Sequence, residues 1–220
     1  MNIRKQKNAI IKNVLKKELG PARLFFMIKC SSLGKRLFKK SKWGKTGDAE
    51  SDFLKPYAVA AALYIKLKKK TGREKALGIM RNIIVPVGCI QQNAMVAETD
   101  IPDNEPMKRL MAFNNLMDIK GASQFNERKY VKKEKNICHF KIKRCVYRDF
   151  FDSFGIPELT KLFCEVYKDF FIPAFPAFNV HRGSSWENTL AYGREECDFI
   201  FELKKQNRET AFNQREEQSC

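Results

Sequence analysis

The feature that most constrains the fold is a change in the spacing of apolar residues near position 130. Before this position, apolar residues recur three and four positions apart, the spacing of one face of an amphipathic helix. After it, Cys138, Phe140 and Ile142 alternate with polar residues, which is the period of a half-buried strand. This order predicts an α+β fold, in which N-terminal helices precede a small, mainly antiparallel sheet with packed helices.

Residues 1–47 are expected to form a basic amphipathic helical segment, split into two helices at Gly20-Pro21. The helical pattern stops over 41–47, and we place a boundary after Gly47. Residues 48–220 are expected to form one α+β domain. Its predicted helices cover 52–70, 73–97 with a kink at Pro86, 107–118, 147–154 and 157–171, the last ended by Pro173 and Pro176. Its predicted strands cover 138–142, 178–182 and 197–203.

The positive charge is concentrated in residues 1–47, which hold 14 Lys and Arg against a single acid, Glu18. Residues 48–220 hold 28 bases and 24 acids. A basic amphipathic segment is typical of weak contact with an anionic membrane surface or with nucleic acid. The alternative is a helix pair that packs on the body and keeps a solvated lysine face. The nearly balanced body argues against a protein that binds nucleic acid over its whole surface.

Cysteine usage and the N-terminus predict the compartment. The chain has seven Cys in 220 residues, an odd number in a protein large enough to fold without disulfides. Its first residues lead into no apolar stretch typical of a secretory leader, and no apolar run approaches the roughly 20 residues of a membrane span. We therefore expect a cytoplasmic protein with reduced thiols, or one attached peripherally to a membrane.

Candidate site residues gather in the last third of the chain, where none of the motifs HExxH, GxSxG, CxxC or a Gly-rich phosphate loop occurs. The polar and thiol residues there are Cys145, Arg148, Cys164, Glu165, His181, Arg182, Thr189, Cys197 and Asp198. Cys164 flanks the apolar stripe of its helix, and Cys197 shares the apolar face of its strand. Since a helix packs on a sheet at about 10 Å, we predict that both thiols face one pocket. The alternative is that each thiol packs as a small hydrophobic residue.

Two stretches of this region resemble the L-2-amino-thiazoline-4-carboxylic acid hydrolase family. Residues 148–165 contain a short helix, a Gly-Ile-Pro-Glu-Leu turn and a helix with a Phe-Cys pair. Residues 188–201 contain Thr-Leu-Ala-Tyr-Gly followed by the strand entry Cys-Asp-Phe-Ile-Phe. The resemblance covers about 145–201, extends weakly over 56–95 and does not include 1–47.

The resemblance implies ring-opening hydrolysis of a cyclic amidine such as 2-amino-thiazoline-4-carboxylate, which gives a carbamoyl-cysteine. It implies that Cys164 and Cys197 supply thiol chemistry or bind a divalent metal, with Glu165 or Asp198 as acid or base. Arg182 would then bind the substrate carboxylate, with His181 and Thr189 as further substrate contacts. The family has an acid three residues after the helix cysteine, and this chain has Tyr167 there.

Two other functions stay open. The tyrosine at position 167 favours a non-catalytic small-molecule-binding or sensor protein on the same fold. The charge of residues 1–47 favours a surface-associated protein. The requirement for a cofactor or metal and the oligomeric state are not indicated by the sequence.

Overall fold

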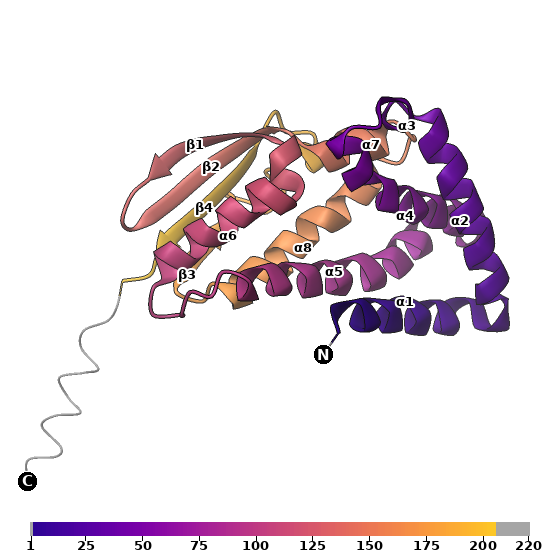
Figure 1. Cartoon of the computed structure of the whole chain (residues 1–220), viewed down its shortest axis with the longest axis horizontal. Coiled ribbons are helices and arrows are strands. Elements are labelled where there is room, and N and C mark those ends of the chain that lie inside the picture. Colours follow the sequence, from indigo (N-terminus) through magenta and orange to yellow (C-terminus); the bar gives the residue numbers. More distant parts are fainter. Residues whose placement is uncertain (1, 206–220) are drawn as a thin grey trace, which may run out of the picture.

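The computed structural model describes residues 2–205 and confirms the α+β fold (Figure 1). Its α-helices are α1 (Ile3–Leu19), α2 (Arg23–Lys40), α3 (Trp43–Thr46), α4 (Ala49–Thr71), α5 (Arg73–Ala97), α6 (Pro106–Lys120), α7 (Val146–Asp152) and α8 (Glu158–Ala174). Its strands are β1 (Glu127–Lys133), β2 (Ile137–Arg144), β3 (Phe178–His181) and β4 (Cys197–Leu203). Three 3₁₀ turns connect them, at Gly20–Ala22, Ala122–Phe125 and Leu190–Tyr192. No helix within 2–205 is long and apolar enough to span a bilayer.

The predicted helices are present, with one correction at the end of α8. The chain turns at Gly20-Pro21 as expected, and Pro86 lies inside α5. Pro173 and Pro176 are predicted to end this helix, but α8 continues through Pro173 to Ala174 and ends before Pro176. A proline in the last turn removes a single backbone donor, and the helix still closes because the Phe175 N–H donates to the Phe171 carbonyl.

The sheet has the strand order β1-β2-β4-β3, and every neighbouring pair is antiparallel. Strand β1 is not predicted from the sequence, because Glu-Arg-Lys-Tyr-Val-Lys-Lys has no regular apolar alternation. β1 is an edge strand rich in lysine, a composition that discourages pairing with other chains. Arg128 anchors it: the side chain pairs with Asp118 of α6 and lies 5.1 Å from the Phe140 ring.

One face of the sheet carries the core of this half of the molecule. Phe140 of β2 stacks on Phe199 of β4, with ring centroids 4.9 Å apart. Helices α6 and α8 cover this face, and Phe171 of α8 contacts the Phe199 and Phe201 rings. Cys197 is buried on the same face, beside α8. The site described below lies in this layer between helix and sheet.

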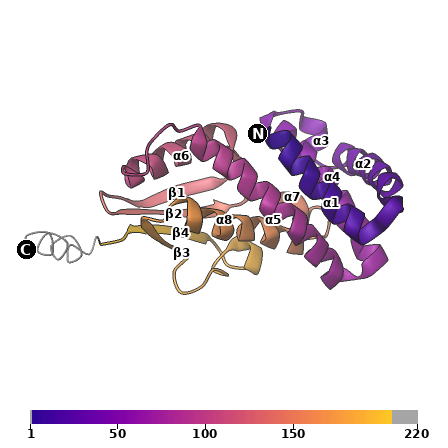
Figure 2. The same ribbon diagram turned by 90° about the horizontal axis from the view of Figure 1, so that it is seen from below.

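The N-terminal helices gather at the other end of the molecule (Figure 2). Helix α1 packs on α5 and α2 packs on α4, while most of their lysines are exposed. Leu15, Cys30 and Trp43 are buried in one cluster with α4, α5, α7 and α8. The Trp43 ring lies 5.1 Å from that of Phe150 in an edge-to-face contact. The apolar core therefore continues across the boundary after Gly47.

Candidate functional site

Arg182 is the central residue of the candidate site. It follows β3, and its side chain is only 2% exposed. The guanidinium carbon lies 4.1 Å from the centroid of the Phe199 ring and 5.8 Å from that of Trp186. Two aromatic rings thus hold the cation within the layer between α8 and the sheet.

All three guanidinium nitrogens of Arg182 are buried, and none has a hydrogen-bond partner within residues 2–205. A buried cation without an acceptor is costly, because burial removes its hydration and aromatic contacts replace only part of it. The guanidinium presents a planar fork of N–H donors that matches a carboxylate. The arrangement suits a bound anion better than a purely structural role.

Two cysteines and a threonine surround this cation. Cys164 on α8 places its Sγ 3.8 Å from Oγ1 of Thr189, which is fully buried. The backbone N–H of Leu190 donates to Sγ of Cys197 at 3.2 Å. Gly193 completes the turn before β4 with a φ of +83°, a conformation that favours glycine. The turn therefore fixes the Thr189 and Leu190 groups against the two thiols.

Burial determines the protonation state of the thiols. It raises the pKa of Cys197 to about 11 and that of Cys145, at the end of β2, to about 12. It also raises the pKa of Cys164. The Arg182 guanidinium lowers the pKa of Cys164 and Cys197 but does not outweigh burial. The thiols are thus protonated at neutral pH.

Cys164, Cys197, Arg182 and Thr189, four of the residues singled out from the sequence, come together here. Glu165 lies at the edge and is engaged elsewhere: both carboxylate oxygens accept from Arg81 of α5, at 2.6 and 2.8 Å. Within residues 2–205, no three His, Cys, Asp or Glu side chains converge as metal ligands.

Cys145 lies close enough to interact electrostatically with Cys164 and Cys197, but the structure does not bring Asp198, His181 or Arg148 to this centre. Asp198 lies on the opposite face of the sheet, where its Oδ1 is 2.8 Å from Nε2 of His139. Successive residues of a strand alternate between faces, so Asp198 and Cys197 cannot share a pocket. His181 is on the outer face next to Glu202, at 3.5 Å, and Arg148 lies on α7 near Asp152.

Tyr167 occupies the position where the resemblance described above implies an acid. Its ring is 5.6 Å from that of Phe199, and burial raises its pKa well above the usual range of a phenol. It stays a neutral hydroxyl and cannot replace a carboxylate as a base. Two further tyrosines lie nearby, Tyr57 of α4 and Tyr147 of α7, with hydroxyl oxygens 3.0 Å apart. The sequence does not predict that these three tyrosines meet, because they lie on three separate helices.

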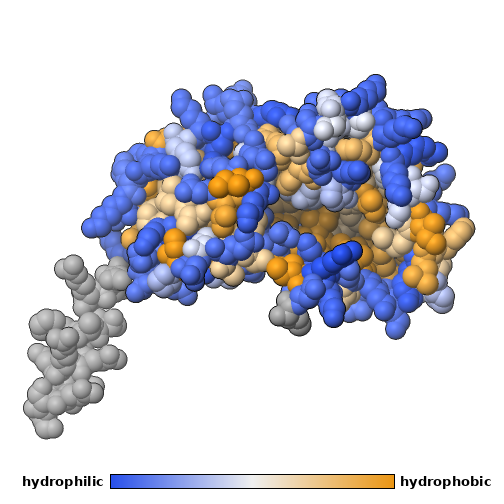
Figure 3. Space-filling view, in the orientation of Figure 1, coloured by the Kyte–Doolittle hydropathy of each residue, from blue (hydrophilic) through white to orange (hydrophobic). Residues whose placement is uncertain are grey.

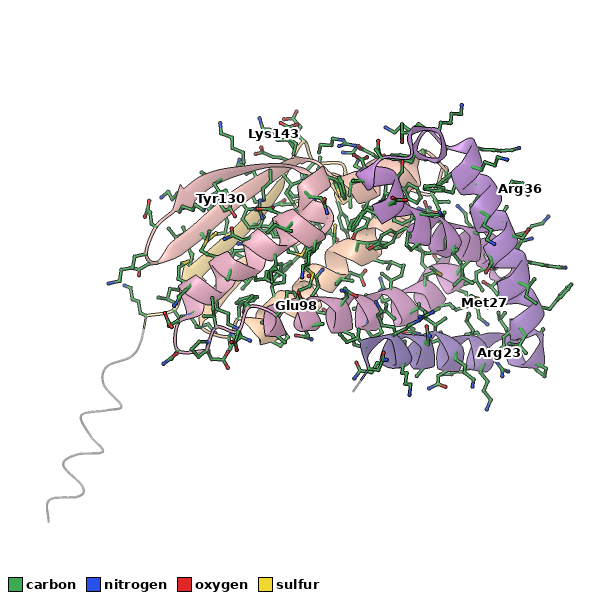
Figure 4. All side chains as sticks on the ribbon, in the orientation of Figure 1. Arg23, Met27, Arg36, Glu98, Tyr130 and Lys143 are labelled. Atoms are coloured by element: carbon green, nitrogen blue, oxygen red, sulfur yellow. The ribbon has the colours of Figure 1, made fainter. Side chains whose placement is uncertain are left out.

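A cavity of about 610 Å³ adjoins the tyrosines. Figure 3 shows it as a hollow with mainly apolar walls in the middle of the face that is turned toward the viewer in Figure 1. Helices α1, α2, α4, α5, α6, α7 and α8 contribute to it, and Met27 of α2 lines it from the N-terminal segment (Figure 4). Tyr167 lies in its wall, whereas Cys164, Cys197 and Arg182 do not. Gln92 adds a buried Oε1 that has no hydrogen-bond partner within 2–205.

Glu158, in the Gly-Ile-Pro-Glu-Leu turn, is a second buried charge, and it is fully engaged. Its Oε1 accepts from the Tyr64 hydroxyl at 2.6 Å and from Lys68 Nζ at 2.9 Å, and Arg73 is 3.4 Å away. Burial alone would raise the pKa of Glu158, but the Tyr64 and Lys68 hydrogen bonds lower it to about 2. This part of the motif joins α8 to α4 and α5 and is structural.

One protein-family model matches the chain. Residues 53–201 match the model of the family described as L-2-amino-thiazoline-4-carboxylic acid hydrolase. The match begins within α4 and ends in β4, so it contains the whole Arg182 centre and leaves out α1–α3. No curated protein and no solved structure matches the chain. Because the match covers most of the chain, the protein belongs to the L-2-amino-thiazoline-4-carboxylic acid hydrolase family.

Proposed function

We propose that the protein opens a small cyclic amidine carboxylate by hydrolysis at the centre formed by Arg182, Cys164, Cys197 and Thr189. The observation that carries this proposal is the guanidinium of Arg182, buried beside two thiols and without an acceptor within 2–205. Membership of the family supports the class of substrate, of which 2-amino-thiazoline-4-carboxylate is the named example.

In this proposal each residue has one role. Arg182 binds the substrate carboxylate through its fork of N–H donors and so positions the ring. The sulfur of Cys164 attacks the amidine carbon between the ring nitrogen and the ring sulfur. The bond from that carbon to the ring sulfur breaks, and the ring sulfur takes the proton that Cys164 gives up. Water then attacks the same carbon, releases a carbamoyl-cysteine and restores the Cys164 thiol.

Thr189 and Cys197 assist this step. The Thr189 hydroxyl, 3.8 Å from the Cys164 sulfur, can stabilise the thiolate that forms transiently. Cys197 is less suited to attack, because its sulfur already accepts the Leu190 N–H. Since the pKa of Cys164 is raised, the attacking thiolate is the minor form at neutral pH, and the rate should increase with pH through the alkaline range.

The experiment follows the appearance of free thiol and carbamoyl-cysteine from 2-amino-thiazoline-4-carboxylate. We expect Cys164→Ala to abolish turnover and Cys89→Ala to leave it unchanged. Cys89 is a matched control, because it is a half-buried thiol that bonds only weakly, at 3.9 Å, to the Val166 carbonyl. Full turnover by a folded Cys164→Ala variant would exclude the nucleophilic role.

A second function, binding of an apolar ligand without turnover, is supported by the cavity. Its volume of about 610 Å³ falls within the 300–1,000 Å³ range of small-molecule sites. Tyrosine hydroxyls and the unpartnered Gln92 oxygen would select a mainly apolar molecule that carries a hydrogen-bond donor. This site would be distinct from the Arg182 centre, from which Tyr167 separates it.

N-phenyl-1-naphthylamine, an apolar fluorescent amine with one N–H donor, tests this function. We expect its fluorescence to rise on binding to the full chain. Ala60→Trp, which fills the cavity, should abolish the rise, whereas Ala9→Trp on the exposed side of α1 should not. Probe binding without turnover of any cyclic amidine would favour the binding protein. Equal binding by the Ala60→Trp variant would exclude the cavity as the site.

A further inference from the structure

Three large apolar side chains are exposed together at the start of α2. Leu24, Phe25 and Ile28 are 67%, 62% and 67% exposed. Ile28 lies four positions after Leu24 and three after Phe25, so the three side chains form one patch within the first two turns of the helix. The other exposed large apolar side chains of α6, β1 and α8, namely Ile119, Val131 and Ile172, lie one on each element.

The packing of α2 fixes the direction in which this patch faces. Cys30 and Gly34 lie on the opposite side of the helix and are buried against α4. A Cβ atom on Gly34 would come within 3.0 Å of the Ala58 carbonyl oxygen. So close a contact leaves α2 no room to roll, and the patch faces away from the protein.

The surroundings of the patch are cationic. Helix α2 holds six Lys and Arg and no acid. Lys35, Arg36 and Lys39 are exposed and continue the side of α2 that carries the patch, and Figure 4 shows Arg36 on the outer side of the helix. Lys29 lies over the Phe25 ring at 4.1 Å. Figure 3 shows apolar surface bordered by hydrophilic residues at this edge of the molecule.

We propose that this edge of α2 docks on an anionic lipid bilayer, with Leu24, Phe25 and Ile28 inserted at the level of the headgroups. Apolar side chains beside exposed lysines are the composition of helices that lie in a membrane interface. The basic residues attract acidic lipids, and the three apolar side chains leave water for the acyl boundary.

Charge and shape favour a bilayer over other occupants. Nucleic acid is bound through its phosphates by basic side chains. The three exposed apolar side chains beside these bases would find no apolar partner on a phosphate backbone and would stay in water. A second copy of the chain would bring one α2 with six cations against another with no acid to offset them.

The test is co-sedimentation of the full chain with vesicles of 70% phosphatidylcholine and 30% phosphatidylserine, about the composition of an acidic leaflet. We expect binding to these vesicles, little binding to pure phosphatidylcholine, and weakening as salt increases. Leu24→Ser/Phe25→Ser/Ile28→Ser should weaken binding at least about tenfold. Each substitution removes most of the favourable free energy of transferring that side chain from water into the bilayer. The control Ile119→Ser/Val131→Ser/Ile172→Ser should bind as the wild type does.

Three results would overturn the proposal. The first is equal vesicle binding by the α2 variant and the control variant. The second is absence of vesicle binding in a chain that binds duplex DNA or RNA regardless of the α2 substitutions. The third is a dimer in solution that the α2 substitutions convert to a monomer, measured by sedimentation equilibrium, in a chain that does not bind vesicles.

Discussion

Glu158 at the start of α8 and Arg182 after β3 are both withdrawn from solvent, and their surroundings differ in a useful way. Three groups, from Tyr64, Lys68 and Arg73, contact the Glu158 carboxylate. Within 2–205, no oxygen accepts a hydrogen bond from the Arg182 guanidinium, and its polar neighbours are the Cys164 and Cys197 thiols. A buried charge with all its partners contributes to stability, and removing one member of such a group is costly. A buried charge without partners lowers stability and is retained where it binds something.

The largest effect should come from replacing Arg182 by methionine, which keeps the length of the side chain and removes the charge. We expect turnover of 2-amino-thiazoline-4-carboxylate to fall at least about 100-fold, because charged hydrogen bonds to the carboxylate are lost. The free energy of unfolding should be unchanged or higher, because an uncompensated charge leaves the core. Urea denaturation and steady-state kinetics on one preparation measure both. A large loss of unfolding free energy in Arg182→Met would show that this cation stabilises the fold as Glu158 does, and would contradict the contrast between the two residues.

The opposite result is expected for Glu158→Gln. The variant keeps the shape of the side chain but loses the charge that Lys68 and Arg73 pair with. Since the pKa of Glu158 is lowered from 4.5 to about 2, the variant should lose about 3 kcal/mol of unfolding free energy at pH 7. The kcat of the folded variant should be close to that of the wild type. Urea denaturation that gave equal midpoints for the two proteins would contradict this assignment.

The pH dependence of stability sharpens the same contrast. The pKa of Glu158 is lower in the folded chain than in the unfolded chain, so its contribution is complete above about pH 4.5 and is lost as the pH falls toward 2. Between pH 7 and pH 3 this group alone should cost the wild type about 2 kcal/mol. The difference between wild type and Glu158→Gln should shrink by that amount, while the difference between wild type and Arg182→Met should not change with pH.

The smallest effect concerns simple anions. If the Arg182 centre binds carboxylates, acetate at ten times its dissociation constant should stabilise the wild type by about 1.4 kcal/mol. That increment should appear as a rise of a few degrees in the melting temperature. Arg182→Met should show no specific rise, and sodium chloride at equal ionic strength serves as the control. An equal rise in both proteins would indicate a general salt effect.

Much of the fold could be predicted from the sequence, because each long helix and the strands β2 and β4 carry a clear apolar period. The exception is β1, which is held by its pairing with β2, by Arg128 and by the contact of the Tyr130 ring with Phe140 rather than by an alternating apolar pattern. Pro173 misled the placement of the end of α8, because a proline in the last turn removes only one hydrogen bond. Both errors concern contacts that a local pattern does not encode.

The candidate site could be predicted in part. Side-chain faces on α8 and β4 correctly place Cys164 and Cys197 in the layer between helix and sheet, but neither thiol lines the cavity, and a pocket shared by the two stays a prediction. The same alternation excludes Asp198, which follows Cys197 directly and must face the other side of the sheet. The lack of a partner for Arg182 could not be foreseen, because it depends on which acids the tertiary structure brings near. No sequence signal identifies the tyrosines of the cavity wall.

Helix α2 separates the cavity on its inner side from the exposed apolar patch on its outer side. Its inner side contributes Met27 to the cavity, and its outer side carries Leu24, Phe25 and Ile28. A helix with its side chains is about 10 Å across, so little else separates the cavity from the proposed membrane surface. Gly34 fixes the middle of α2, so only its first two turns, which hold Met27, could move on the bilayer, and such a movement would change the volume available to a ligand. By thermodynamic reciprocity, a ligand that fills the cavity would then change the affinity for the membrane by the same factor.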